Sequence, residues 1–129
     1  MQLEEMQFKN LHTALDRVLE KWEQKREDYE TEALVLFTER EAEHAFLYLE
    51  EKLRTLDPDG EYQLTYMNRD SQNFKKGLTV TTFYLAKGLE FDQVFGVFHA
   101  ADNSGLAAQA RYITATRALH ELHMYDVED

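Results

Sequence analysis

The sequence predicts a layered α/β fold with a mainly parallel sheet and helices on both faces. The segment EALVLF at residues 32–37 is a continuous apolar run after its first residue, which suits a strand buried on both faces. Stretches with apolar residues at helical spacing lie between this run and similar short runs. Strands that alternate with helices are typical of a parallel sheet covered by helices. We therefore expect a single domain over residues 1–129.

The N-terminal half is predicted to contain two amphipathic helices. Residues 3–28 are expected to form one long helix, because apolar residues recur every three to five positions among charged ones. A second helix is expected over residues 38–56, with Thr38 as its N-cap and Glu41 as the partner in a capping box. The segment DPDG at residues 57–60 is the strongest turn signal in the chain.

The remaining elements follow from short apolar runs separated by polar loops. A polar loop is expected at residues 68–77 and a helix at residues 106–119. The strands of the parallel sheet are expected near residues 33–37, 62–67, 78–83, 93–98 and 121–126.

Composition excludes several classes of protein. The chain has no cysteine, so it has no disulfide framework and no thiolate metal site. His99, His120 and His123 lack the spacing of metal ligands, and no metal site is predicted. The sequence shows no signal peptide and no apolar run near the roughly 20 residues that span a bilayer. We expect a cytoplasmic protein without a membrane partner.

The net charge of −11 by itself argues against nucleic acid as a ligand, but the charge is unevenly distributed. Residues 1–60 carry 16 acidic and 8 basic side chains. Residues 62–118 carry only 4 acidic side chains against 6 basic ones. The second region is therefore slightly basic, and it also contains the two segments with candidate chemistry.

The first of these segments is VTTFYLAKGLEFDQVFGVFH at residues 80–99. Gly88 permits a tight turn with close approach of a ligand, and Lys87 offers a positive charge for a phosphate. Glu90 can accept hydrogen bonds from a ribose hydroxyl. Ligands of open α/β sheets bind at the carboxyl ends of strands, where we expect this turn to lie. The alternative is an ordinary surface turn.

The second segment is ARYITATRALHELHMY at residues 110–125. Arg117 is expected late in a helix, where its side chain can reach across a domain cleft to a phosphate. The alternative is a surface ion pair with a neighbouring carboxylate. If Glu90 and Arg117 serve one cleft, both should be exposed on the same face.

Together the two segments resemble a known family. The pattern T-x-x-x-A-K-G-L-E-F-D-x-V resembles motif V of UvrD-like superfamily 1 DNA helicases, and Y-x-x-x-T-R-A resembles their motif VI. The resemblance is closest to the HelD-type branch. It is specific over residues 78–127 and loose over residues 1–77. It implies the C-terminal, RecA-like domain of a helicase, with DNA repair among the expected roles.

The resemblance implies two groups of site residues. Arg117 matches the motif VI arginine that contacts the ATP γ-phosphate, and Glu90 matches the motif V glutamate near the ribose. Lys87 and Gly88 match the turn that shapes this edge of the cleft.

Thr82 and Tyr84 match the start of motif V, which faces single-stranded DNA. Many relatives have histidine where Tyr84 stands, so a DNA contact there would either become stacking or be lost. Many also have a basic residue in place of Gln109.

The chain has no Walker A or Walker B segment, so it is expected to be inactive as an ATPase by itself. ATP and Mg²⁺ are implied for the intact protein and not for this fragment, which is either an excised domain or a truncated product. The implied partners are single-stranded DNA, bound weakly, and an N-terminal helicase domain. An alternative is an interaction module without enzymatic activity that binds a protein such as RNA polymerase. A Rossmann-like nucleotide binder is disfavoured because no G-x-G-x-x-G occurs.

Overall fold

The computed structural model describes residues 1–70 and 76–128. These residues form six parallel strands and three α-helices in three layers. The elements are β1 (Gln2–Phe8), α1 (Leu11–Lys25), β2 (Thr31–Leu36), α2 (Glu39–Leu56), β3 (Leu64–Tyr66), β4 (Gly77–Thr82), β5 (Phe91–His99), α3 (Gly105–Ala115) and β6 (Ala118–Val127).

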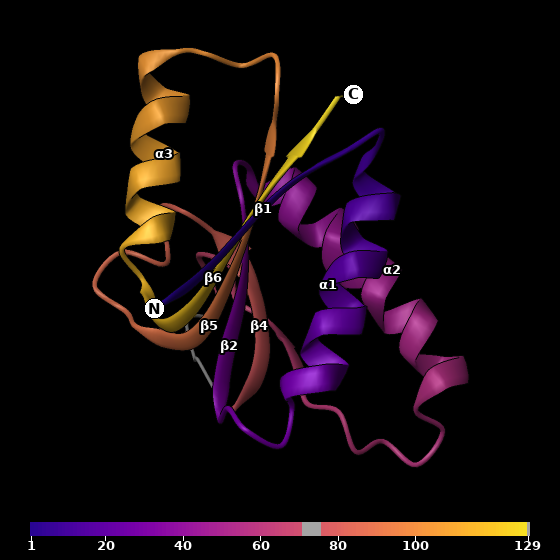
Figure 1. Cartoon of the computed structure of the whole chain (residues 1–129). Coiled ribbons are helices and arrows are strands. Elements are labelled where there is room, and N and C mark those ends of the chain that lie inside the picture. The colour runs from indigo at the N-terminus through magenta and orange to yellow at the C-terminus, as the bar shows by residue number, and fades with distance from the viewer. Residues whose placement is uncertain (71–75, 129) are drawn as a thin grey trace.

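The sheet has the strand order β1-β6-β5-β2-β4-β3, and every neighbouring pair is parallel. Helices α1 and α2 cover one face, and α3 covers the other (Figure 1). The strands run from a lower, amino edge to an upper, carboxyl edge in this view. The predicted three-layer fold is confirmed, and all five predicted strands belong to the sheet. No helix among the described residues is long and apolar enough to cross a membrane.

The prediction of one helix over residues 3–28 is wrong, because this stretch forms β1 and then α1. Asn10 separates the two elements, and its side chain accepts the backbone N–H of Thr13 as the N-cap of α1. Leu3 and Met6 lie in β1 and are 58% and 36% exposed, so they do not extend the buried stripe of the helix. The pairing of β1 with β6 outweighs a helical pattern that was continuous only in sequence.

The start of α2 and the end of α3 can also be compared with the helix boundaries predicted from the sequence. The capping box of α2 is present, with Thr38 accepting the N–H of Glu41 and the Glu41 carboxylate accepting that of Thr38. The helix predicted over residues 106–119 ends at Ala115, because Ala118 already pairs with Phe91 in the sheet. Part of the predicted loop at residues 68–77 lies outside the described residues.

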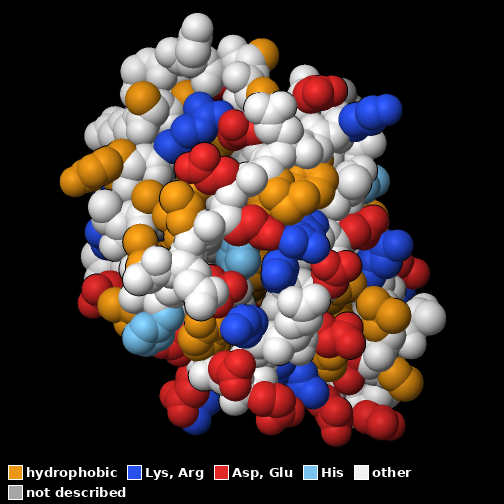
Figure 2. All heavy atoms as spheres, viewed as in Figure 1, with side chains coloured by type: hydrophobic (Ala, Val, Ile, Leu, Met, Phe, Trp, Pro, Cys, Tyr) orange, Lys and Arg blue, Asp and Glu red, His pale blue; other side chains and the backbone are white. Residues whose placement is uncertain are grey.

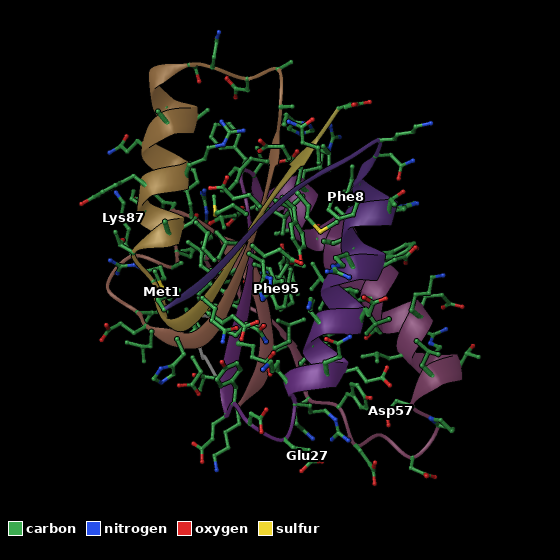
Figure 3. All side chains as sticks on the ribbon, in the orientation of Figure 1. Met1, Phe8, Glu27, Asp57, Lys87 and Phe95 are labelled. Carbon is green, nitrogen blue, oxygen red and sulfur yellow. The ribbon has the colours of Figure 1, made fainter. Side chains whose placement is uncertain are left out.

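Buried polar side chains cross the α1 face of the sheet. Apolar residues such as Phe8 and Phe95 fill most of the space beneath α1 (Figure 3). His123 of β6 lies between two strands, with Nδ1 2.7 Å from Oε1 of Glu4 and Nε2 2.7 Å from Oε1 of Gln93. The Gln93 amide donates in turn to Glu32 of β2 at 2.7 Å. The chain of contacts therefore links β1, β6, β5 and β2.

Glu4 and Glu32 lie at the two ends of this series of hydrogen bonds, and their pKa values are shifted in opposite directions. Burial raises the pKa of Glu32 from 4.5 to about 8. Burial also raises the pKa of Glu4, but hydrogen bonds from Tyr125, Arg17 and His123 outweigh it and lower the pKa to about 2. Glu4 is thus held as a carboxylate, whereas Glu32 keeps its proton at neutral pH.

The protonated state of Glu32 predicts how stability depends on pH. Between about pH 4.5 and pH 8 the unfolded chain has released this proton and the folded chain still holds it. The free energy of unfolding should therefore fall as pH rises through that window, by at most roughly 1.4 kcal/mol per pH unit. Glu32→Gln removes the titration, so its stability relative to the native chain should rise between pH 5 and pH 8.

Urea denaturation at several pH values measures this difference. Glu50→Gln, an exposed glutamate on α2, is the matched control and should run parallel to the native chain. Parallel curves for Glu32→Gln and the native chain would show that Glu32 is ionised in the folded protein.

Candidate functional site

The connection from β4 to β5 spans the full height of the sheet. Both strands are parallel to β2, which lies between them, so the chain must return from the carboxyl edge to the amino edge. Residues 83–90 make this return as a series of turns without a helix. Phe83, Ala86 and Phe91 pack into the core on the α3 side, which places the connection on that face.

This path separates the predicted site residues. Thr82 ends β4 at the carboxyl edge, whereas Glu90 precedes β5 at the amino edge. The expectation that Glu90 lies at the carboxyl end of the third predicted strand is therefore wrong. The physical reason is the strand direction. Since β5 runs parallel to β4, it must start at the edge opposite to the one where β4 ends.

The amino edge brings Glu90 and Arg117 together. The backbone N–H of Phe91 donates to the carbonyl of Arg117 at 2.9 Å, so the residue after Glu90 is bonded directly to Arg117. Glu90 is exposed, as expected, and Arg117 is partly exposed. Arg117 lies after the end of α3, not within it, because the C-cap is Thr116.

The guanidinium of Arg117 is not used in a salt bridge within the described part of the chain. Its Nη2 donates to the hydroxyl of Thr116 at 3.1 Å. Its Nε is buried and has no hydrogen-bond partner among the described residues. A buried donor without an acceptor is costly, so an incoming acceptor at this position would be stabilised. Among residues 1–70 and 76–128, the local ion pair considered as the alternative does not form.

Gly88 and Lys87 lie between the two edges. Gly88 has φ +80°, a conformation that favours glycine, and the turn therefore depends on it. Both residues are exposed, and Lys87 lies on the side of the sheet that carries α3 (Figure 3). Its Nζ stands 5.1 Å from the centre of the Tyr84 ring, a cation–π distance. Lys87 therefore contacts the carboxyl-edge aromatic rather than Glu90 or Arg117.

The carboxyl edge carries a hollow of about 430 Å³. Its lining residues are Phe37, Glu39, Arg69, Thr82, Tyr84 and Leu85. Tyr84 is 67% exposed, so its ring can accept a stacked base. Thr82 is only 4% exposed, and its hydroxyl accepts the N–H of Leu85 at 3.3 Å. Thr82 therefore shapes the turn that presents Tyr84.

The sequence reasoning missed Phe37 and Arg69 as members of this edge. Phe37 stacks on Phe83 with ring centroids 5.6 Å apart, and Arg69 contacts Glu39. Phe37 ends one predicted strand and Arg69 follows the next, and carboxyl ends of parallel strands share one edge. That signal was present in the sequence, but no motif marks either residue.

One side of the amino edge is acidic. Acidic side chains gather at the lower end of the face shown in Figure 2, where α1 ends and the chain enters β2. Asp28 and Glu30 belong to this stretch. This stretch therefore repels an anionic ligand. Among the described residues, no cluster of three or more His, Asp or Glu side chains suits a metal ion.

Comparison with known protein families and with curated proteins finds no match to the sequence. Two helicase domains are among the solved structures with a similar fold. The C-terminal domain of a possible DNA helicase from Lactobacillus plantarum WCFS1 has a TM-score of 0.75 and 22% identity, covering 98% of this chain and 74% of that one. Domain 2 of the DEAD-box helicase Mss116p, bound to an RNA duplex, has a TM-score of 0.60 and 8% identity, covering 100% and 56%. The chain thus has the RecA-like fold of helicase C-terminal domains.

Proposed function

We propose that this chain is the second RecA-like domain of an ATP-dependent DNA helicase of the UvrD-like superfamily 1 type. The observation that carries the proposal is the proximity of two segments that resemble separate motifs, joined by the backbone hydrogen bond from Phe91, the residue after Glu90, to Arg117. The similarity in fold to a possible DNA helicase supports the same reading. The HelD-type branch is the closest sequence resemblance.

In this proposal the amino edge forms one wall of an inter-domain ATP cleft. Arg117 provides the positive charge for the γ-phosphate, and its buried Nε lacks an acceptor among the described residues. Glu90 accepts hydrogen bonds from the ribose. An N-terminal domain supplies the phosphate-binding loop and the ligands of Mg²⁺, because the sequence here has no Walker A or Walker B segment.

The carboxyl edge forms part of the track for single-stranded DNA. The exposed ring of Tyr84 provides a stacking surface, and Lys87 beside it provides a charge for the backbone. Thr82 contributes by holding the turn rather than by direct contact, since its side chain is buried. Motif V thereby serves the nucleotide at one edge and DNA at the other.

The role of Arg117 can be tested in a polypeptide that contains this chain and its ATP-binding domain. Arg117→Ala should lower the ATPase rate by about 10³–10⁵, the range for an arginine finger. Folding stability should change little, because the side chain forms no salt bridge within the described residues. Phosphate release and thermal unfolding measure the two effects.

The control is Arg40→Ala, which removes an exposed arginine of α2 and should leave turnover unchanged. Normal turnover in Arg117→Ala would remove the nucleotide role from this edge. ATPase activity that belongs to the isolated chain would equally contradict the need for a second domain.

Binding of single-stranded DNA by this chain alone should be weak and sensitive to salt. Residues 62–118 carry an excess of only two basic side chains, so few phosphates can be neutralised. Tyr84→Ala should lose roughly 1–3 kcal/mol of binding if one base stacks on the ring. Fluorescence anisotropy at low and moderate salt measures both, with exposed Tyr112→Ala as the matched aromatic control. Tight binding that is independent of salt would contradict the proposal.

The second candidate function is an interaction module without enzymatic activity. Leu106 and Tyr112 of α3 favour it, because they are 54% and 71% exposed and offer apolar surface to a protein partner. In the helicase proposal the same surface meets the N-terminal domain. The Arg117→Ala experiment separates the two functions, since only the helicase requires the guanidinium for turnover.

A further inference from the structure

An ion pair at the carboxyl edge faces the same hollow as Tyr84. Nε of Arg69 lies 3.4 Å from Oε1 of Glu39, the first residue of α2. The same carboxylate oxygen also accepts the backbone N–H of Arg69 at 3.3 Å. Both side chains line the hollow of about 430 Å³ together with Phe37 and Tyr84. One carboxylate thus fixes both the backbone and the side chain of Arg69 at this wall.

We propose that Arg69 is a phosphate contact of the single-strand track and that Glu39 restrains it until nucleic acid binds. The inference rests on the proposed DNA track and adds two residues that lie outside both helicase-like motifs. Arg69 and the exposed ring of Tyr84 line the same hollow, so a base stacked on the ring would bring its phosphates close to Arg69.

The pair is suited to exchange its partner. The Arg69 and Glu39 side chains are 76% and 41% exposed, and ion pairs with this degree of exposure are weak. The contact runs through Nε, whereas a phosphate is bound best by two nitrogens of the guanidinium fork. A phosphate can therefore displace the Glu39 carboxylate from this exposed ion pair.

Glu39 keeps a second source of stabilisation after the exchange. It lies in the first turn of α2, where the helix dipole favours a negative charge. Before the exchange its carboxylate neutralises Arg69 and repels phosphate from the hollow. Removing this charge should therefore strengthen DNA binding, the reverse of what loss of an ordinary contact residue does.

Anisotropy of a fluorescein-labelled oligodeoxythymidylate, titrated with the whole chain, tests the proposal. Glu39→Gln keeps the side-chain shape and should tighten binding by about two- to fivefold. Arg69→Ala should weaken binding and reduce the slope of log affinity against log salt by about 1. In the Arg69→Ala background, Glu39→Gln should give a smaller gain, because only the repulsion between the Glu39 carboxylate and the phosphates is left to remove.

Glu50→Gln is the matched control, since it removes an exposed glutamate near the other end of α2. If Glu39→Gln changes affinity no more than Glu50→Gln, or if its gain is undiminished without Arg69, the restraint by Glu39 is refuted while the DNA track stands. If neither the native chain nor Glu39→Gln binds the oligonucleotide at low salt, the proposed track and this inference both fail. Circular dichroism of each variant confirms that the compared proteins are folded.

Discussion

The common direction of the six strands is the constraint on which the placement of the site depends. In a wholly parallel sheet the chain must return to the amino edge before each new strand. Helices α1, α2 and α3 make three of these returns, but residues 83–90 make the one between β4 and β5 without a helix. A short segment of sequence is thereby stretched over the height of the sheet. Tyr84 and Glu90 end at opposite edges although only five residues separate them.

The hydrogen bonds between buried polar side chains beneath α1 explain how β1 is held in the sheet. Most residues of β1 are exposed, so burial alone stabilises this strand little. Glu4 instead accepts hydrogen bonds from Tyr125 at 2.5 Å and from Arg17 of α1 at 2.5 Å, and it also contacts His123. A slip of one residue would move Glu4 to the other face and leave these partners unsatisfied. The register of the edge strand is thus specified by these hydrogen bonds together with the packing of Phe8 against Tyr125.

The sequence predicts the fold well where each element carries its own local signal. The capping box at Thr38 and the apolar run before it correctly place α2 and β2. The first residues were misassigned because Leu3 and Met6 fit a helical period by chance, and only their pairing with β6 reveals a strand. Glu90 was assigned to the wrong edge because strand direction is a property of the whole sheet. The resemblance to helicases led us to expect Glu90 near Arg117, and the residue after Glu90 is hydrogen-bonded to Arg117. The contact of Arg69 with Glu39 depends on tertiary packing, and no sequence motif marks it.

The division of labour between the two edges can be tested by backbone amide NMR of the ¹⁵N-labelled chain during titration with an oligodeoxythymidylate at low salt. The account predicts shifts at Tyr84, Leu85 and Arg69, with the amides of Glu90 and Arg117 unchanged. Shifts centred on Glu90 and Arg117, with none at Tyr84, would contradict it, because DNA would then occupy the edge assigned to the nucleotide.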